Sequence, residues 1–311
     1  MDTPTILQIA RIALSPYVNN RNTGNKYEIW HIMRVVRQMG LTDENITTLL
    51  PMFQKIDNRN VGTLDNVAKI LAMPVGNRLC FNGHSVKNIR NVTQTDGDGG
   101  TGDLILICEG NREFSISVTG KINAKKLVKC LTNPSCRRLG CSDAEIALIK
   151  EIEKAAPAQL DQEFIGKFGA DRIKWPSIKR LPTTTAKSCA NRAGQIAVDR
   201  FNGLPDEEKR RIMNDVHHIE RAPADYLCIV SRHKLIYYQF GAPTMDKDTW
   251  IPRAEVRGIY IDVFHEEKQI SKTQVKFNNG IGSPLCSSWN LNAMLANLYN
   301  MTLISSPFTQ S

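Results

Sequence analysis

The hydrophobic positions in the first quarter of the chain recur at helical spacing. Residues 5–14 read TILQIARIAL, and the isoleucine, methionine and valine positions within residues 29–36 follow one face of a helix. Residues 42–45, TDEN, begin another helix in the manner of a capping motif. We therefore expect helices here, including an N-terminal helical insertion at about residues 42–76 that follows the first core helix.

Strand-like alternation begins near residue 78 and recurs to the C-terminal part of the chain. In residues 113–121, EFSISVTGK, the apolar Phe114, Ile116 and Val118 alternate with polar side chains, which predicts a strand with one buried face. Helical patterns at 143–156, 186–204 and 205–219 are interspersed with strand patterns at 226–240, 258–264 and 272–279. The expected fold is α/β, with a mixed central β-sheet flanked by helices in a single domain over residues 1–311.

The composition is that of an ordinary globular protein. Of the 311 residues, 41% are hydrophobic and 23% are charged, which argues against disorder. The sequence has no run of 18 apolar residues, and its start lacks the basic and apolar blocks of a secretory signal. The eight cysteines are scattered, which suits reduced thiols. We expect a cytoplasmic protein with no membrane partner.

The distribution of basic residues indicates a polyanionic partner. The net charge is +9, and residues 114–142, 172–198 and 268–311 contain basic residues but no aspartate or glutamate. Such tracts are typical of proteins that bind the phosphates of nucleic acids. The candidate phosphate contacts are Lys125, Lys126, Arg137, Arg138, Lys179 and Arg180. The candidates for reading base edges, which arginine, lysine and asparagine can do, are Arg192, Arg232, Lys276 and Asn278.

Residues 103–121 are predicted to form a β-hairpin whose open end carries candidate catalytic side chains. A three-residue loop at Gly110–Arg112 would place Asp103 opposite Thr119, with Lys121 as a diagonal neighbour on the same face. A two-residue turn would put the carboxylate on the buried face, at a high cost. A carboxylate, a lysine and a hard cation suffice to hydrolyse a phosphodiester.

A magnesium site at this hairpin needs a second carboxylate, because one acid holds the ion weakly. The candidates are Glu28, Asp98, Glu109 and Glu113.

Three short segments resemble those of one nuclease family. GDLILIC and EFSISVTGK resemble the PD-(D/E)xK motif, in which one strand opens with aspartate and its partner carries an acid, one spacer and a lysine. NTGNKYEIW, residues 22–30, resembles the first core helix of many type II restriction endonucleases, where a glutamate faces the active site. VKFNNGIGSPLCSSWNLN, residues 275–292, resembles a basic, glycine- and serine-rich strand near their C-terminus.

The resemblance implies a restriction-endonuclease-like fold and a set of catalytic residues. Asp103 and Glu28 would bind Mg²⁺, Lys121 would position or help activate the attacking water, and Ser117 and Thr119 would support that water.

The motif can be read in two registers. Thr119-Gly120-Lys121 keeps the lysine but has threonine in place of the acid, whereas Ser117-Val118-Thr119 has threonine where the lysine belongs.

The expected function is Mg²⁺-dependent, sequence-specific cleavage of double-stranded DNA by a type II restriction endonuclease that works as a homodimer. One alternative is a DNA-binding protein without catalysis that uses the same basic residues. Another is a structure-specific repair nuclease, which would give no discrete pattern of fragments.

Overall fold

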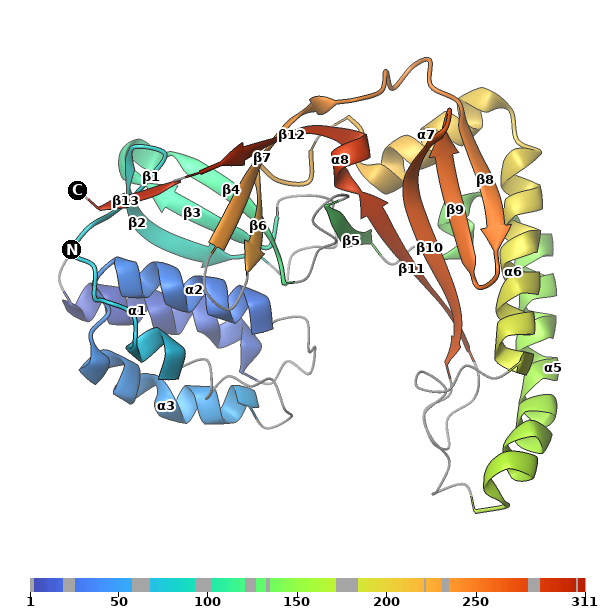
Figure 1. The fold of residues 1–311 in the computed structure, drawn as a ribbon, viewed down its shortest axis with the longest axis horizontal. Helices are drawn as coiled ribbons and strands as arrows, with labels where there is room; N and C mark the ends of the chain where they lie inside the picture. The colour runs from blue at the N-terminus through green and yellow to red at the C-terminus, as the bar shows by residue number, and fades with distance from the viewer. Residues whose placement is uncertain are drawn as a thin grey trace. The chain divides into compact units, whose positions relative to one another are not determined.

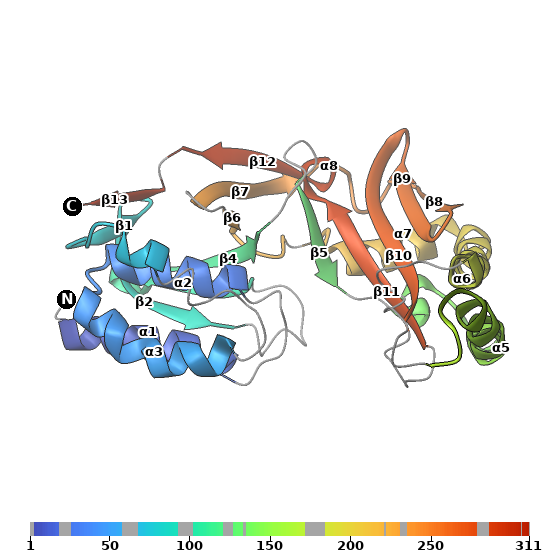
Figure 2. The same cartoon turned by 60° about the horizontal axis from the view of Figure 1, so that its bottom comes forward.

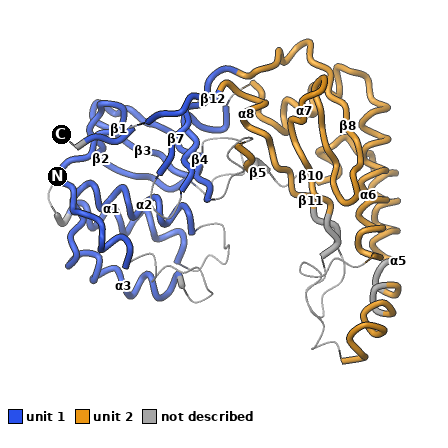
Figure 3. Tube along the Cα trace, viewed as in Figure 1, with its two compact units in different colours: residues 1–122, 221–242, 301–311 blue, residues 123–220, 243–300 orange. Residues whose placement is uncertain are grey.

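The chain folds into two compact units, coloured separately in Figure 3. The structure is a computed structural model that describes residues 3–18, 26–57, 68–92, 102–120, 127–132, 135–171, 184–220, 222–230, 235–278, 286–305 and 307–310. Unit 1 comprises residues 1–122, 221–242 and 301–311, and unit 2 comprises residues 123–220 and 243–300. The single domain expected over residues 1–311 stays a prediction, and each unit is described here by itself.

Unit 1 combines helices with a mixed sheet (Figure 1). Its helices are α1 (Thr3–Leu14), α2 (Lys26–Gln38) and α3 (Asp43–Asp57). Its strands are β1 (Leu79–Phe81), β2 (His84–Asn91), β3 (Leu104–Cys108), β4 (Glu113–Thr119), β6 (Tyr226–Val230), β7 (Leu235–Pro243), β12 (Tyr299–Ile304) and β13 (Phe308–Gln310). The strand order is β12-β7-β6-β4-β3-β2-β1-β13. The sheet is mixed because β4 and β6 pair in parallel, whereas β3 and β4 are antiparallel.

The sheet of unit 1 curls around an aromatic core. The ring of Phe81 in β1 lies 5.2 Å from that of Phe114 in β4 and 5.6 Å from that of Tyr237 in β7, measured between centroids. Two strands lie between β1 and β4 in the sheet order, and four lie between β1 and β7, so only a strongly curved sheet brings these rings together. Helix α2 contacts β4 and β6 and is buried from Glu28 to Arg37. It therefore forms part of the core rather than a surface layer.

Unit 2 packs helices against a five-stranded antiparallel sheet, as Figure 2 shows from a second direction. Its helices are α5 (Asp143–Phe168), α6 (Thr184–Asn202), α7 (Asp206–His217) and the short α8 (Leu295–Leu298), with a 3₁₀ turn, η5 (Cys136–Leu139). Its strands are β5 (Val128–Thr132), β8 (Pro252–Arg257), β9 (Tyr260–His265), β10 (Lys268–Asn278) and β11 (Cys286–Met294), in the order β5-β11-β10-β9-β8. Helix α6 contacts β8, β9 and β10, and α5 packs on α6.

The described elements confirm the α/β class, the mixed sheet and the flanking helices. Helix α3 and the helical residues 68–71 lie within the expected insertion at 42–76. Within the ranges given above, none of the helices has the length and apolar character needed to cross a membrane.

Candidate active site

The hairpin of β3 and β4 has a different loop from the one expected. The loop is Glu109–Asn111, so the expectation of Gly110–Arg112 was wrong by one position. Gly110 and Asn111 adopt φ values of 73° and 57°. These two residue types tolerate the left-handed conformation best, so the turn centres on them.

The shift of the loop changes the partner of Asp103. Leu104 lies opposite Ile116, and the same register places Asp103 beside Ser117 instead of Thr119. Thr119 lies in β4, where it pairs with Ile229 of β6. The two hydroxyl residues still share one strand face, because they are two positions apart.

The Asp103 carboxylate is held by the end of β4. Its Oδ2 accepts a hydrogen bond from the backbone N–H of Val118 at 2.5 Å, and the hydroxyl of Ser117 lies 3.4 Å from the same atom. Gly102 precedes it with a φ of +79°, and a Cβ on Gly102 would lie 2.9 Å from the carbonyl oxygen of Ile116. A glycine is therefore required here to turn the chain and present Asp103.

Glu28 lies in the first turn of α2, where the helix dipole favours a carboxylate. Its side chain is buried, with 8% of the residue surface exposed, and its Oε2 accepts a hydrogen bond of 2.7 Å from the hydroxyl of Tyr17. The hydrogen bond offsets part of the cost of burying the acid. Glu28 is thus fixed in the core and is not a solvated helix residue.

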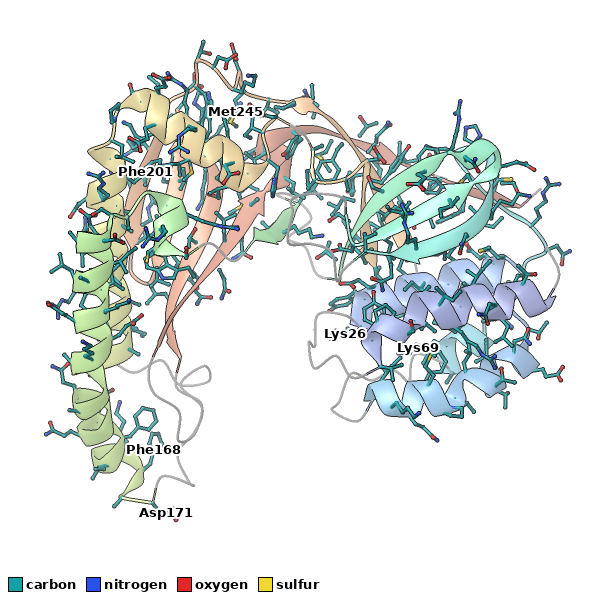
Figure 4. All side chains as sticks on the ribbon, turned by 180° about the vertical axis from the view of Figure 1, so that it is seen from behind. Lys26, Lys69, Phe168, Asp171, Phe201 and Met245 are labelled. Atoms are coloured by element: carbon teal, nitrogen blue, oxygen red, sulfur yellow. The ribbon has the colours of Figure 1, made fainter. Side chains whose placement is uncertain are left out.

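The start of α2 presses directly on the end of β4. A Cβ on Gly120, the residue after the strand, would lie 1.8 Å from the ring of Tyr27. Lys26, the first residue of α2 and labelled in Figure 4, holds its ammonium 4.8 Å from the centre of the same ring. Glu28 follows Tyr27 in the sequence, so its backbone lies near the strand end that Asp103 caps, while its carboxylate accepts the Tyr17 hydrogen bond.

His31 extends this arrangement along α2, one helical turn after Glu28. It is fully buried, and its Nε2 is hydrogen-bonded to the hydroxyl of Tyr237. Burial lowers the pKa of His31 to about 3, the charge of Arg34 lowers it as well, and the Asp103 carboxylate opposes both. The opposing effect of Asp103 places that carboxylate within electrostatic reach of the inner face of α2.

Arg34 completes the polar side of the helix. It is buried, and its guanidinium carbon lies 4.8 Å from the centre of the Trp30 ring. Burial lowers the pKa of Arg34, whereas Cys228 and Tyr237 raise it. Glu28, His31 and Arg34 follow at intervals of three residues, so they share one face of α2. Of these three residues, only Glu28 was predicted from the sequence as part of the site, although their spacing could have revealed the other two.

Other predicted residues of the site have different positions. Glu109 forms ion pairs with Lys87 at 3.3 Å and Arg78 at 3.8 Å, and Glu113 pairs with Arg90 at 2.9 Å. Both acids lie at the loop end of the hairpin, so they are not the second carboxylate beside Asp103. Two further candidates, Lys121 and Asp98, lie outside the described residues.

The predicted DNA contacts are only partly described. Arg137 is exposed and forms an ion pair of 2.5 Å with Asp143, Arg138 is exposed in η5, and Arg192 is exposed on α6. Lys276 and Asn278 belong to β10, but their side chains lie outside the description. The remaining candidates, Lys125, Lys126, Lys179, Arg180 and Arg232, also lie outside the described residues.

The donor atoms at the site suit a hard cation. Among the described residues, no group of three or more histidine, cysteine or acidic side chains is placed to hold a metal ion. Mg²⁺ is commonly held by one or two carboxylates, with water and substrate phosphate as its other ligands. Asp103 and Glu28 would supply that number of carboxylates.

Comparisons of the chain with protein-family models, with curated proteins and with solved structures found no match. The assignment of a function therefore rests on the residues and their geometry.

Proposed function

We propose that this chain is a Mg²⁺-dependent endonuclease that cleaves double-stranded DNA at defined sequences, as type II restriction endonucleases do. The observation that carries the proposal is the arrangement of Asp103 and Glu28. Asp103 caps the end of β4, and the Glu28-bearing start of α2 presses on the same strand end. Lys121 follows that strand end by two residues in the sequence. A restriction-endonuclease-like fold is part of this proposal.

The proposed roles follow from the chemistry of each side chain. Asp103 and Glu28 would hold Mg²⁺, which when bound supplies Lewis acidity to the scissile phosphate. Lys121 would orient the attacking water and stabilise the charge that develops on the phosphate. Ser117 and the N–H of Val118 keep the Asp103 carboxylate in place, and Tyr17 does the same for Glu28.

The basic tracts favour DNA as the phosphodiester. A net charge of +9, with acid-free stretches in both halves of the chain, suits a long polyanion better than a small phosphate ester. Cleavage of a palindromic sequence would require two copies of the site, so the proposal includes a homodimer.

The direct test is digestion of phage DNA by the purified chain with Mg²⁺, followed by sequencing of the fragment ends. We expect discrete fragments that share one terminal sequence and that disappear when EDTA is added. Fragments with random ends would indicate a repair nuclease, and intact DNA with both Mg²⁺ and Mn²⁺ would contradict the proposal.

The variant Asp103→Asn separates catalysis from structure. The amide oxygen still accepts the Val118 N–H, so the strand end is kept while the negative charge is lost. We expect cleavage to fall at least about a hundredfold, with DNA binding in EDTA unchanged.

Asp225→Asn is the matched control for this variant. The Asp225 carboxylate also accepts a backbone N–H of β4, that of Ser115 at 2.7 Å, but it lies further back along the strand. Equal loss of cleavage in both variants would show that Asp103 is only a structural cap.

A further inference from the structure

The sheet of unit 2 has one buried face and one polar face. Along β10, Ser271, Thr273 and Val275 are buried and alternate with half-buried Lys272 and Gln274. Helix α6 covers the buried face (Figure 1), and a Cβ on its Gly194 would lie 3.5 Å from Ile261 and 3.8 Å from Val275. The side chains of the alternate positions therefore point away from α6.

The opposite face, which we call the polar sheet face, is organised in cross-strand rows. Gln274 of β10 lies opposite Tyr260 of β9 on one side and Asn290 of β11 on the other. Arg257 of β8 lies opposite Tyr260 and extends this row to four strands. With neighbouring strands about 4.8 Å apart, the row is about 14 Å long.

A second row runs beside the first. Lys272 of β10 lies opposite Asp262 of β9 and Asn292 of β11. The ammonium of Lys272 lies 4.0 Å from the centre of the Tyr260 ring, which links the two rows.

The amides on this face are unusual for a strand surface. Asparagine is depleted in β-strands, yet Asn290 and Asn292 occupy two successive outward positions of β11. Within the described part of the chain, the side-chain amides of Gln274, Asn290 and Asn292 make no hydrogen bond. Each amide thus has donors and acceptors available to a ligand.

The charge of the face favours a polyanionic ligand. Strands β10 and β11 contain no acid, and β10 contains three lysines. The acids of the face are on β8 and β9. Glu255 is paired with Arg253 and Arg257, and the buried Asp262 lies 3.7 Å from Arg257.

We infer that the polar sheet face reads base edges in the major groove of double-stranded DNA. Lysine and arginine are matched to guanine, and asparagine and glutamine to adenine. The major groove is about 12 Å wide and accepts a two-stranded β-ribbon. Beyond the segments where β9 pairs with β10 (Lys268–Gln274) and β5 pairs with β11 (Leu291–Met294), the two strands continue as such a ribbon, in which Val275–Asn278 pair with Cys286–Trp289, and the row of Gln274 and Asn290 lies where this ribbon leaves the sheet. The inference rests on the proposed function and assigns sequence recognition to unit 2, in addition to the cleavage proposed for unit 1.

Other occupants suit the face less well. The deep and narrow major groove of an RNA duplex does not admit a ribbon. A protein partner would require a cluster of apolar and aromatic anchors, whereas Tyr260 stands among amides and charges in these rows.

The test uses the full chain with Asp103→Asn, so that binding is measured without cleavage. A library of random-sequence DNA duplexes is mixed with this parent protein, and the bound duplexes are recovered and sequenced. The parent is expected to enrich one sequence. With Gln274→Ala, Asn290→Ala and Asn292→Ala added, we expect at least about tenfold weaker binding of that sequence, similar binding of random duplexes, and no enriched sequence.

Two further variants keep the test decisive. If the triple variant fails to fold, Asn290→Ala alone is used in its place, because it leaves most of the face intact. This single variant is expected to relax the selected sequence at one position. Lys154→Ala, on the exposed surface of α5, is the control and is expected to enrich the parent's sequence.

The possible results separate this inference from the proposed function. Enrichment of the same sequence by the single and triple amide variants, or of no sequence by the parent, would overturn the inference. Preferred binding of an RNA duplex would do so too. If the wild-type chain never cuts DNA but the amide variants still lose the sequence selection of the parent, the inference stands. The proposed nuclease activity is then contradicted.

Discussion

His31 is a fully buried titratable residue of α2. Its Nε2 is hydrogen-bonded to the hydroxyl of Tyr237. Within the described residues, its Nδ1 has no hydrogen-bond partner. A lowered pKa keeps the ring neutral at physiological pH. A neutral His31 would not repel the cation that we propose for Asp103 and Glu28.

The pKa of His31 predicts a loss of stability in mild acid. Its pKa falls from 6.5 in the unfolded chain to about 3 in the fold, so between these values only the unfolded chain binds the proton. The free energy of unfolding is therefore expected to decrease as the pH falls, by about 2 kcal/mol from this residue between pH 7 and pH 5. Urea unfolding at the two pH values measures the difference.

His31→Gln removes this titration, so the variant is expected to lose about 2 kcal/mol less than the wild type between pH 7 and pH 5. His84→Gln, at a half-buried histidine of β2, serves as the control and should retain the wild-type difference. An unchanged difference in His31→Gln would show that the residue is not neutral in the fold.

The polar face of α2 was partly predictable from the sequence. Glu28, His31 and Arg34 recur at a spacing of three, and the pattern alone places them together on a helix. The partner of His31 was not predictable in this way, because Tyr237 is 206 residues away. Only the curl of the sheet and the packing of α2 on it bring the two together.

At the level of elements, the contact between α2 and β4 positions the two acids. It depends on the absence of a side chain at Gly120, against which the Tyr27 ring lies. Gly120→Ala is expected to lower the free energy of unfolding by about 2 kcal/mol, because the added methyl overlaps the ring. Denaturant unfolding measures the loss, and cleavage should fall with it because Glu28 moves with Tyr27.

Gly166→Ala provides the contrast for this prediction. Gly166 lies inside α5 with no atom within 4 Å of an added Cβ, so alanine should stabilise the helix by about 0.5–1 kcal/mol. Tyr27→Ala combined with Gly120→Ala should lose less than the sum of the single changes, since the overlap is gone. Additive losses would exclude the proposed contact.

The hairpin shows why alternation alone does not determine register. Moving a three-residue loop by one position changes the partner of Asp103 by two residues and keeps every side chain on its face. The hydrophobic pattern is equally satisfied by both registers. The backbone conformations of Gly110 and Asn111 favour the register that is observed.

At the level of the whole molecule, the positive charge predicts DNA binding that weakens with salt. Each phosphate contact contributes about 0.9 to the slope of log K against log salt concentration. Arg138→Ala, at an exposed candidate phosphate contact, is expected to reduce that slope by about 1, and Lys154→Ala on α5 should leave it unchanged. Fluorescence anisotropy with a labelled duplex measures both, and equal slopes would show that Arg138 contacts no phosphate.

The two units were not visible in the sequence. Domain boundaries are usually recognised by linkers rich in glycine, proline or polar residues, and no such linker was predicted from the sequence. Each unit is assembled from separate stretches, with residues 221–242 and 301–311 returning to unit 1. Local sequence patterns do not show that a later segment of the chain packs into an earlier unit.

The parallel pair of β4 and β6 has a consequence for the order of folding. Ile116 pairs with Tyr226, so residues more than a hundred positions apart must meet before the strand that ends beside Asp103 has both neighbours. A nascent chain that ends at residue 122 lacks β6, β7, β12 and β13, which are four of the eight strands of the sheet. Such distant pairings fold slowly. The proposed cleavage activity would thus arise only after synthesis has passed unit 2, and a truncated product would be harmless to the DNA of the cell that makes it.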